Sequence, residues 1–156
     1  MRKEQNRDER VISHFGGEWK AFNFLDADQL EEVREQFLAY VRPLPDQVKQ
    51  STDLVIGDFG AGSGRWAHYL LPQAKELWLV EPGVESFALL AARFAKEKKV
   101  HLLNETVSKN SVPEDSLDLA VSLGVLHHIP DTERGIVDIY GKIKPGGYFL
   151  CYLYYA

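Results

Sequence analysis

The chain has 156 residues, of which 45% are hydrophobic, and a formal net charge of −5. This length and composition are typical of one globular domain, and the acidic balance argues against a nucleic-acid binder, which needs a basic excess. No apolar run approaches the ~20 residues that span a bilayer, no signal-peptide core follows the start, and the single cysteine, Cys151, excludes an internal disulfide. We therefore expect a cytoplasmic protein.

The first 50 residues predict a helical segment that precedes any sheet. The charged run at residues 2–10 is expected to be a solvated tail. Four aromatic residues follow, which either pack into a core or form a lid over a ligand: Phe15, Trp19, Phe22 and Phe24. From Asp28, apolar residues at helical spacing predict a helix that ends at Pro43. We divide the chain into an N-terminal helical or lid segment, residues 1–50, and a second domain, residues 51–156.

In the second domain, short apolar runs alternate with helical patterns. Five runs predict strands, at residues 54–59, 76–80, 100–103, 117–123 and 148–155. Three stretches between them predict helices, at residues 65–71, 84–98 and 132–143. Strands that alternate with helices form parallel β-α-β units, with helices on both faces of the sheet. The fold class is therefore α/β.

A glycine-rich stretch, Asp58-Phe-Gly-Ala-Gly-Ser-Gly64, leaves the first predicted strand and enters a helix. Glycines in that position permit a tight turn and close approach of a ligand to the backbone. No Gly-Lys-Ser/Thr follows, which excludes a P-loop, and Arg65 stands where a dinucleotide fingerprint has its third glycine. The Asp58 carboxylate would repel a pyrophosphate and attract an ammonium group.

A second carboxylate, Glu81, ends the second predicted strand, 21 residues after Gly60. A carboxylate at that place hydrogen-bonds both hydroxyls of a ribose. Together, Asp58 and Glu81 predict a ligand made of a nucleoside and a cationic amino-acid tail.

These motifs resemble those of the class I S-adenosylmethionine-dependent methyltransferases, in the branch that acts on small molecules. Residues 58–64 and Glu81 resemble the first two motifs of the family. Three later stretches resemble its other motifs: residues 113–122, 126–129 and 144–147. The resemblance implies a doubly wound, mostly parallel Rossmann-like sheet with strand order 3-2-1-4-5.

The resemblance also implies which residues bind S-adenosylmethionine. They are Asp58, Gly60, Ala61, Gly62, Ser63, Gly64, Glu81, Pro82, Glu105, Thr106, Val107, Ser122 and Leu123. The glycine loop would hold the methionine end, Glu81 the ribose, and Pro82 would lie beside the adenine. Family members commonly place an acidic residue against the adenine amino group. Here Thr106 occupies that place and Glu105 precedes it, so both are candidates.

The function that we expect is methyl transfer from S-adenosylmethionine to a small-molecule acceptor, in which the protein mainly positions the two partners in line. His127 is the candidate general base for a hydroxyl acceptor, while an orienting or structural role for it stays open. The histidines lack the spacing of a metal site. Two alternatives stay open: a non-catalytic S-adenosylmethionine-binding module and a nucleotide-dependent oxidoreductase.

The last residues, 148–156, form an apolar and aromatic run instead of a polar tail. A complete sheet of the resembled family has seven strands, so its last two are expected to be absent here. The outer edge of the fifth strand would then be unpaired, which favours aggregation unless something covers it. We therefore expect either a C-terminally truncated methyltransferase or a homo-oligomer in which a second copy covers that edge.

Overall fold

The structure is a computed structural model that describes residue 6, residues 8–12 and residues 27–154. The aromatic residues Phe15, Trp19, Phe22 and Phe24 lie outside the described residues, so the choice between a core and a lid role stays a prediction. The first described element is a helical turn at residues 9–12, which the Asp8 carboxylate caps by accepting a hydrogen bond from the Arg10 amide at 2.9 Å.

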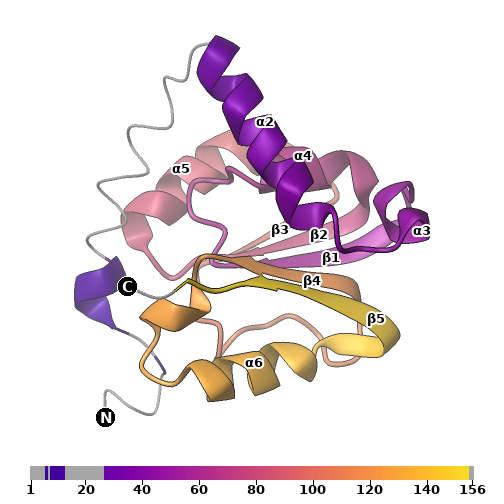
Figure 1. The fold of residues 1–156 in the computed structure, drawn as a ribbon. Helices are drawn as coiled ribbons and strands as arrows, with labels where there is room; N and C mark the ends of the chain where they lie inside the picture. Colours follow the sequence, from indigo (N-terminus) through magenta and orange to yellow (C-terminus); the bar gives the residue numbers. More distant parts are fainter. Residues whose placement is uncertain (1–5, 7, 13–26, 155–156) are drawn as a thin grey trace.

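The described residues form one five-stranded parallel sheet (Figure 1). Its strands are β1 Leu54–Phe59, β2 Ala74–Val80, β3 Val100–Leu103, β4 Leu117–Leu123 and β5 Ile143–Tyr152. They lie in the order β3-β2-β1-β4-β5, which confirms the predicted α/β fold and strand order. Strand β4, which lies between β1 and β5, is buried along nearly its whole length, as expected for a strand covered on both faces.

Helices cover both faces of the sheet (Figure 1). They are α2 Ala27–Val41, α3 Asp46–Lys49, α4 Ala67–Leu70, α5 Val84–Phe94 and α6 Thr132–Tyr140, with short 3-10 turns η2 Leu71–Gln73 and η3 Leu126–His128. One core joins α2, α4 and α5 to the sheet, and includes Phe37, Leu70 and Leu90. The second core joins α6 and η3 to the opposite face through Ile139 and Leu126. Among the described residues, no helix has the length and apolar character needed to cross a membrane.

The boundary between α6 and β5 differs from the prediction. The helix expected to reach residue 143 ends at Tyr140, and Ile143 instead begins β5, opposite Leu117 in β4. The pairing then shifts from Leu117–Ile143 to Leu119–Tyr148, so β5 carries extra residues at this point. Gly146 lies within that bulge with φ of +84°, a conformation that favours glycine. The Pro-Gly-Gly stretch is therefore part of the strand.

The carboxyl ends of all five strands meet at one edge of the sheet, because the strands are parallel. The helical turn at residues 9–12, drawn in indigo, lies beside this edge (Figure 1). Ligands of open α/β sheets bind at this edge.

Candidate functional site

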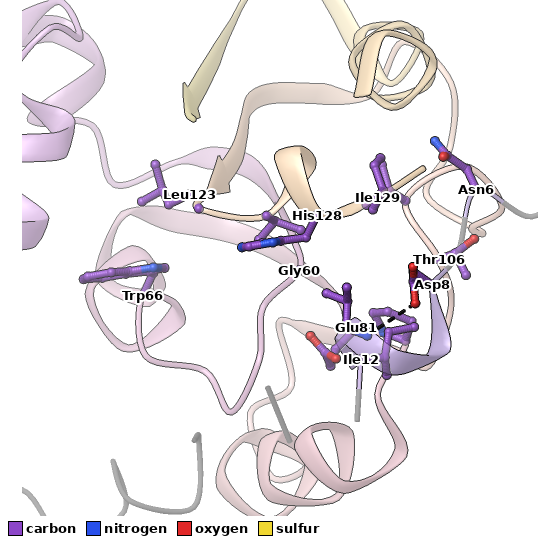
Figure 2. Close-up of a pocket in the computed structure, with 15 residues that line it drawn as sticks. Asn6, Asp8, Ile12, Gly60, Trp66, Glu81, Thr106, Leu123, His128 and Ile129 are labelled. Atoms are coloured by element: carbon purple, nitrogen blue, oxygen red, sulfur yellow. Dashed lines mark hydrogen bonds between the residues drawn. The ribbon is translucent and has the colours of Figure 1, made fainter. Parts of the chain in front are cut away.

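A pocket lies at the carboxyl ends of the strands, between the sheet and the N-terminal turn (Figure 2). Its walls come from the N-terminal turn and from the carboxyl ends of β1, β2, β3 and β4 with the segments that follow them: Asn6, Asp8, Val11, Ile12, Gly60, Trp66, Glu81, Pro82, Thr106, Val107, Leu123, Gly124, Val125, His128 and Ile129. Trp66, Leu123 and His128 lie toward one end, and Glu81, Asp8 and Thr106 toward the other (Figure 2). We call these the Trp66 end and the Glu81 end.

The glycine loop places its backbone against this pocket. Gly60 has φ of +87°, and a Cβ atom added there would lie 2.6 Å from both Val125 methyl carbons. Gly64, with φ of +89°, has a different reason to be glycine, since its Cβ would lie 2.4 Å from the Phe94 ring of α5. Gly60 therefore keeps the pocket wall open, while Gly64 lets α5 pack closely on the loop.

Glu81 joins the glycine loop to the end of β2. Its carboxylate accepts hydrogen bonds from the Gly62 amide at 2.8 Å and from the Gly83 amide at 2.7 Å. The side chain is buried, which raises the pKa of Glu81, while these two bonds act in the opposite direction. A carboxylate held in this way keeps further lone pairs for two hydroxyl donors.

Asp58, at the end of β1, is the most deeply buried acid of the site. It is 1% exposed, and its Oδ2 atom has no hydrogen-bond partner among the described residues. Burial, and secondarily the nearby charge of Glu81, raises the pKa of Asp58 to about 7. The Ser63 hydroxyl in the next loop is likewise buried without a partner in the described part of the chain. Buried polar atoms are normally hydrogen-bonded, and a bound ligand with donor groups would supply the partners for the Asp58 oxygen and the Ser63 hydroxyl.

The two candidates for the adenine contact lie differently in the loop after β3. The Glu105 carboxylate accepts hydrogen bonds from the Ser111 amide and, at 2.7 Å, from the Ser111 hydroxyl. Both bonds lie within the loop that follows β3, so they link two parts of that loop. Thr106 and Val107 line the pocket instead.

Six of the residues expected to bind the cofactor line the pocket: Gly60, Glu81, Pro82, Thr106, Val107 and Leu123. The others are not among the residues that line it: Asp58, Ala61, Gly62, Ser63, Gly64, Glu105 and Ser122. The Ser122 hydroxyl donates to the Phe59 carbonyl at 3.0 Å and so ties β4 to β1. The assignment of these residues to a cofactor stays a prediction.

The two adjacent histidines of η3 lie differently. His128 lines the pocket, and its Nε2 atom lies 3.1 Å from the Tyr154 hydroxyl. Both ring nitrogens of His127 are buried without a hydrogen-bond partner among the described residues, and burial and the neighbouring His128 lower the pKa of His127. The structure thus brings His128, and not His127, to the pocket, while a base role for His127 stays untested.

The N-terminal wall was not expected from the sequence. Asn6 is 2% exposed, so the expectation of a solvated tail is wrong at this position. Its side-chain amide donates to the Asp131 carbonyl at 2.8 Å and to the Ser108 hydroxyl at 3.1 Å, and its oxygen accepts from the Asp131 amide at 2.8 Å. These bonds fix the chain two residues before Asp8, and Asp8 and Ile12 line the pocket with Asn6. They join positions more than 100 residues apart, and no local pattern signals them.

Comparisons with known proteins agree on one class of enzyme. Residues 58–149 match the family model of a methyltransferase domain. The chain is 30% identical over 108 residues to an uncharacterized methyltransferase from Geobacillus, covering 67% of this chain and 48% of that protein. It is 25% identical over 152 residues to a ubiquinone biosynthesis O-methyltransferase from Rickettsia felis, covering 94% of this chain and 58% of that protein.

A solved structure supports the same class. The crystal structure of an S-adenosylmethionine-dependent methyltransferase from Mesorhizobium loti superposes with a TM-score of 0.58 at 29% identity, covering 71% of this chain and 49% of that one. The chain spans about half the length of the curated relatives that it matches.

Proposed function

Because the chain belongs to the class I S-adenosylmethionine-dependent methyltransferases, we propose that it transfers the methyl group of that cofactor to a small-molecule acceptor in the pocket described above. The cofactor supplies an electrophilic methyl carbon on a sulfonium. The protein contributes binding, alignment of the two partners and exclusion of water. Water is excluded by apolar side chains that line the pocket, among them Val11, Ile12 and Val125.

The observation that carries this proposal is the pair of buried carboxyl groups at the glycine loop. Glu81 lines the pocket with a carboxylate already fixed by two backbone amides, which suits it to accept from ribose hydroxyls. Asp58 has an oxygen without a partner among the described residues and suits the ammonium group of the methionine end. A dinucleotide would instead bring a pyrophosphate close to these two acids.

The proposal of a small acceptor has two supports. The net charge of −5 does not suit a nucleic-acid substrate. The relative from Rickettsia felis is by its name an O-methyltransferase of ubiquinone biosynthesis, which gives a precedent for a small acceptor.

Calorimetry with S-adenosylmethionine and with its product, S-adenosylhomocysteine, tests the proposal. We expect both to bind the wild-type chain, and Asp58→Ala to weaken S-adenosylmethionine binding by about tenfold or more, because a charge-assisted hydrogen bond is lost. Asp53→Ala is the matched control, since Asp53 is exposed just before β1. Unchanged binding by Asp58→Ala, or tighter binding of a nicotinamide dinucleotide than of S-adenosylmethionine, would contradict the assignment. Saturation with cofactor without methylation of any acceptor would favour the non-catalytic module.

A further inference from the structure

We propose that Asp8, at the start of the N-terminal turn, selects the base of the cofactor together with Thr106, because its carboxylate accepts a hydrogen bond from the 6-amino group of adenine. This inference rests on the proposed function and deepens it, since it gives the N-terminal turn a part in the choice of cofactor.

The two oxygens of Glu81 indicate on which side of the ribose the base would lie. The Oε2 atom accepts from the Gly62 amide of the glycine loop, and the Oε1 atom accepts from the Gly83 amide. In S-adenosylmethionine the amino-acid tail and the base are attached to opposite sides of the ribose ring. Because Asp58 favours the tail at the glycine loop, the base is expected on the Gly83 side.

The N-terminal turn packs on this side of Glu81. A Cβ atom built on Gly83 would lie 2.8 Å from the Glu81 Oε1 atom and 3.3 Å from a methyl carbon of Ile12. The Ile12 amide donates to the Asp8 carbonyl at 3.1 Å, so Asp8 lies one helical turn from Ile12. Both residues line the pocket, and Asp8 lies toward its Glu81 end (Figure 2). The turn therefore forms one wall of the expected base site.

Asp8 has an oxygen available for the edge of a base. Its Oδ1 atom caps the turn, because it accepts from the Arg10 amide at 2.9 Å and from the Val11 amide at 3.4 Å. Among the described residues, no hydrogen bond engages its Oδ2 atom. The cap thus fixes the carboxylate and leaves its second oxygen as an acceptor. An amino group of a ligand would be a suitable donor to it.

Thr106 supplies the complementary group. Its hydroxyl oxygen accepts from the Lys109 amide at 3.1 Å, so its own hydrogen can be donated to a ligand. Adenine presents an amino donor beside a ring nitrogen that accepts, which matches an acceptor from Asp8 and a donor from Thr106. Hypoxanthine presents the reverse pattern, an oxygen acceptor beside an N–H donor. The pair of side chains therefore favours adenine over hypoxanthine.

The other polar side chains of the described pocket wall have different places or partners. His128 lies toward the Trp66 end, and the Glu81 carboxylate is the expected partner of the ribose (Figure 2). The Asn6 side chain makes three hydrogen bonds within the protein, which also fix the chain two residues before Asp8. Asp8 is therefore the acidic side chain of this wall that is left for the base, and its backbone is held in advance of binding.

Calorimetry with two ligands that differ only in the base tests the inference. The probes are S-adenosylhomocysteine and S-inosylhomocysteine, in which hypoxanthine replaces adenine. We expect wild type to bind the adenosyl compound about tenfold or more tightly than the inosyl compound, because the latter places an oxygen opposite the Asp8 carboxylate. Equal affinities of wild type for the two compounds would overturn the inference.

Asp8→Asn replaces the free acceptor by a donor. Asparagine caps helices as well as aspartate does, so its oxygen keeps the bond to the Arg10 amide while its NH2 group takes the place of Oδ2. We expect this variant to bind S-adenosylhomocysteine about tenfold or more weakly than wild type, and S-inosylhomocysteine at least as tightly as wild type does.

Two further variants complete the comparison. Glu9→Gln is the matched control, because it removes the same charge from the next residue, which is exposed and is not among the residues that line the pocket. It should keep the wild-type preference between the two compounds. Thr106→Val removes the hydroxyl donor and should reduce that preference several-fold. A preference in Glu9→Gln as altered as that in Asp8→Asn would contradict a specific role for Asp8.

Amide hydrogen exchange separates recognition of the base from capping of the turn. We expect exchange at residues 8–12 of ligand-free Asp8→Asn to stay within about twofold of wild type. If this variant instead weakens both compounds equally and raises exchange there, Asp8 only stabilises the turn, and the inference is wrong.

The remaining outcomes separate this inference from the proposed function. If wild type binds S-adenosylhomocysteine but Asp8→Asn keeps the wild-type preference between the two compounds, the role of Asp8 is wrong and the proposed function stands. If neither compound binds wild type, the proposed function and this inference fall together.

Discussion

Asp58 combines deep burial with a neighbouring carboxyl group, and both disfavour its charged form. Its pKa of about 7 lies far above its ordinary value of 3.8. Between these values the folded chain keeps the proton while the unfolded chain has lost it, so the free energy of unfolding falls as the pH rises from about 4 to about 7. A cationic ligand group favours ionised Asp58, so its binding strengthens over the same window.

We predict that Asp58→Asn removes this pH dependence. Asparagine has the shape of the protonated acid and never ionises, so the ligand-free variant should melt at a higher temperature than wild type at pH 8 and at nearly the same temperature at pH 4. Thermal unfolding between pH 4 and pH 9 measures the difference. The exposed Asp53→Asn is the control. A melting difference that stays constant across this range would show that Asp58 does not titrate as described.

Gly60 allows a second prediction. Alanine there meets an unfavourable φ of +87° and two Val125 methyl groups at 2.6 Å. We expect Gly60→Ala to lower the free energy of unfolding by about 1–3 kcal/mol and to weaken S-adenosylhomocysteine binding, because Val125 lines the pocket.

Gly146→Ala is the matched control for this change. Gly146 has φ of +84°, but a Cβ added there would have nothing within 4 Å. The control therefore carries the backbone strain without the clash, and it should lose stability while keeping the ligand affinity. Denaturant unfolding and calorimetry measure the two effects. Equal ligand affinities of the two variants would contradict a role for Gly60 in keeping the pocket open.

At the scale of single elements, the Asn6 side chain fixes the chain just before the N-terminal turn. The Asn6 side chain bonds the backbone carbonyl and the backbone amide of Asp131, the residue just before α6. We predict that Asn6→Ala releases residues 8–12, raises amide hydrogen exchange there and weakens S-adenosylhomocysteine binding several-fold, since a buried hydrogen-bond pair contributes about 1–3 kcal/mol.

Ser108→Ala gives a graded comparison, because it removes only the bond from Asn6 to the Ser108 hydroxyl. Its effect should be smaller than that of Asn6→Ala in both measurements. Unchanged exchange at residues 8–12 in Asn6→Ala would show that other contacts hold the turn.

The elements also show what the sequence could predict. The strands at 100–103 and 117–123 were predicted with their observed bounds, because each is an apolar run between polar loops. The end of α6 was wrong by three residues, since Ile143 fits a helical pattern and only its pairing with Leu117 places it in β5. The burial of Asn6 and the positions of Glu105 and His128 depend on contacts between distant parts of the chain, which no local pattern reveals.

At the scale of the whole molecule, β5 is an edge of the described sheet, with β4 as its neighbour there. That a second copy or a further segment covers this edge stays a prediction. If a second copy does, light scattering should give the mass of a dimer, and Cys151→Lys should dissociate it, because the exposed Cys151 lies on β5 and lysine opposes edge pairing. Val137→Lys, on the exposed side of α6, is the control. A single-chain mass for wild type contradicts the second copy.

The order of the strands predicts that amino-acid substitutions affect the two ends of the pocket differently. β1 has neighbours on both sides, and the glycine loop that follows it is fixed by Glu81. The Trp66 end instead depends on the tip of β5, where the Tyr152 carbonyl accepts from the Gly124 amide at 2.9 Å. Edge strands open locally at a lower free energy than central strands. Substitutions at the tip of β5 are therefore expected to perturb the Trp66 end of the pocket more than the end that Glu81 fixes.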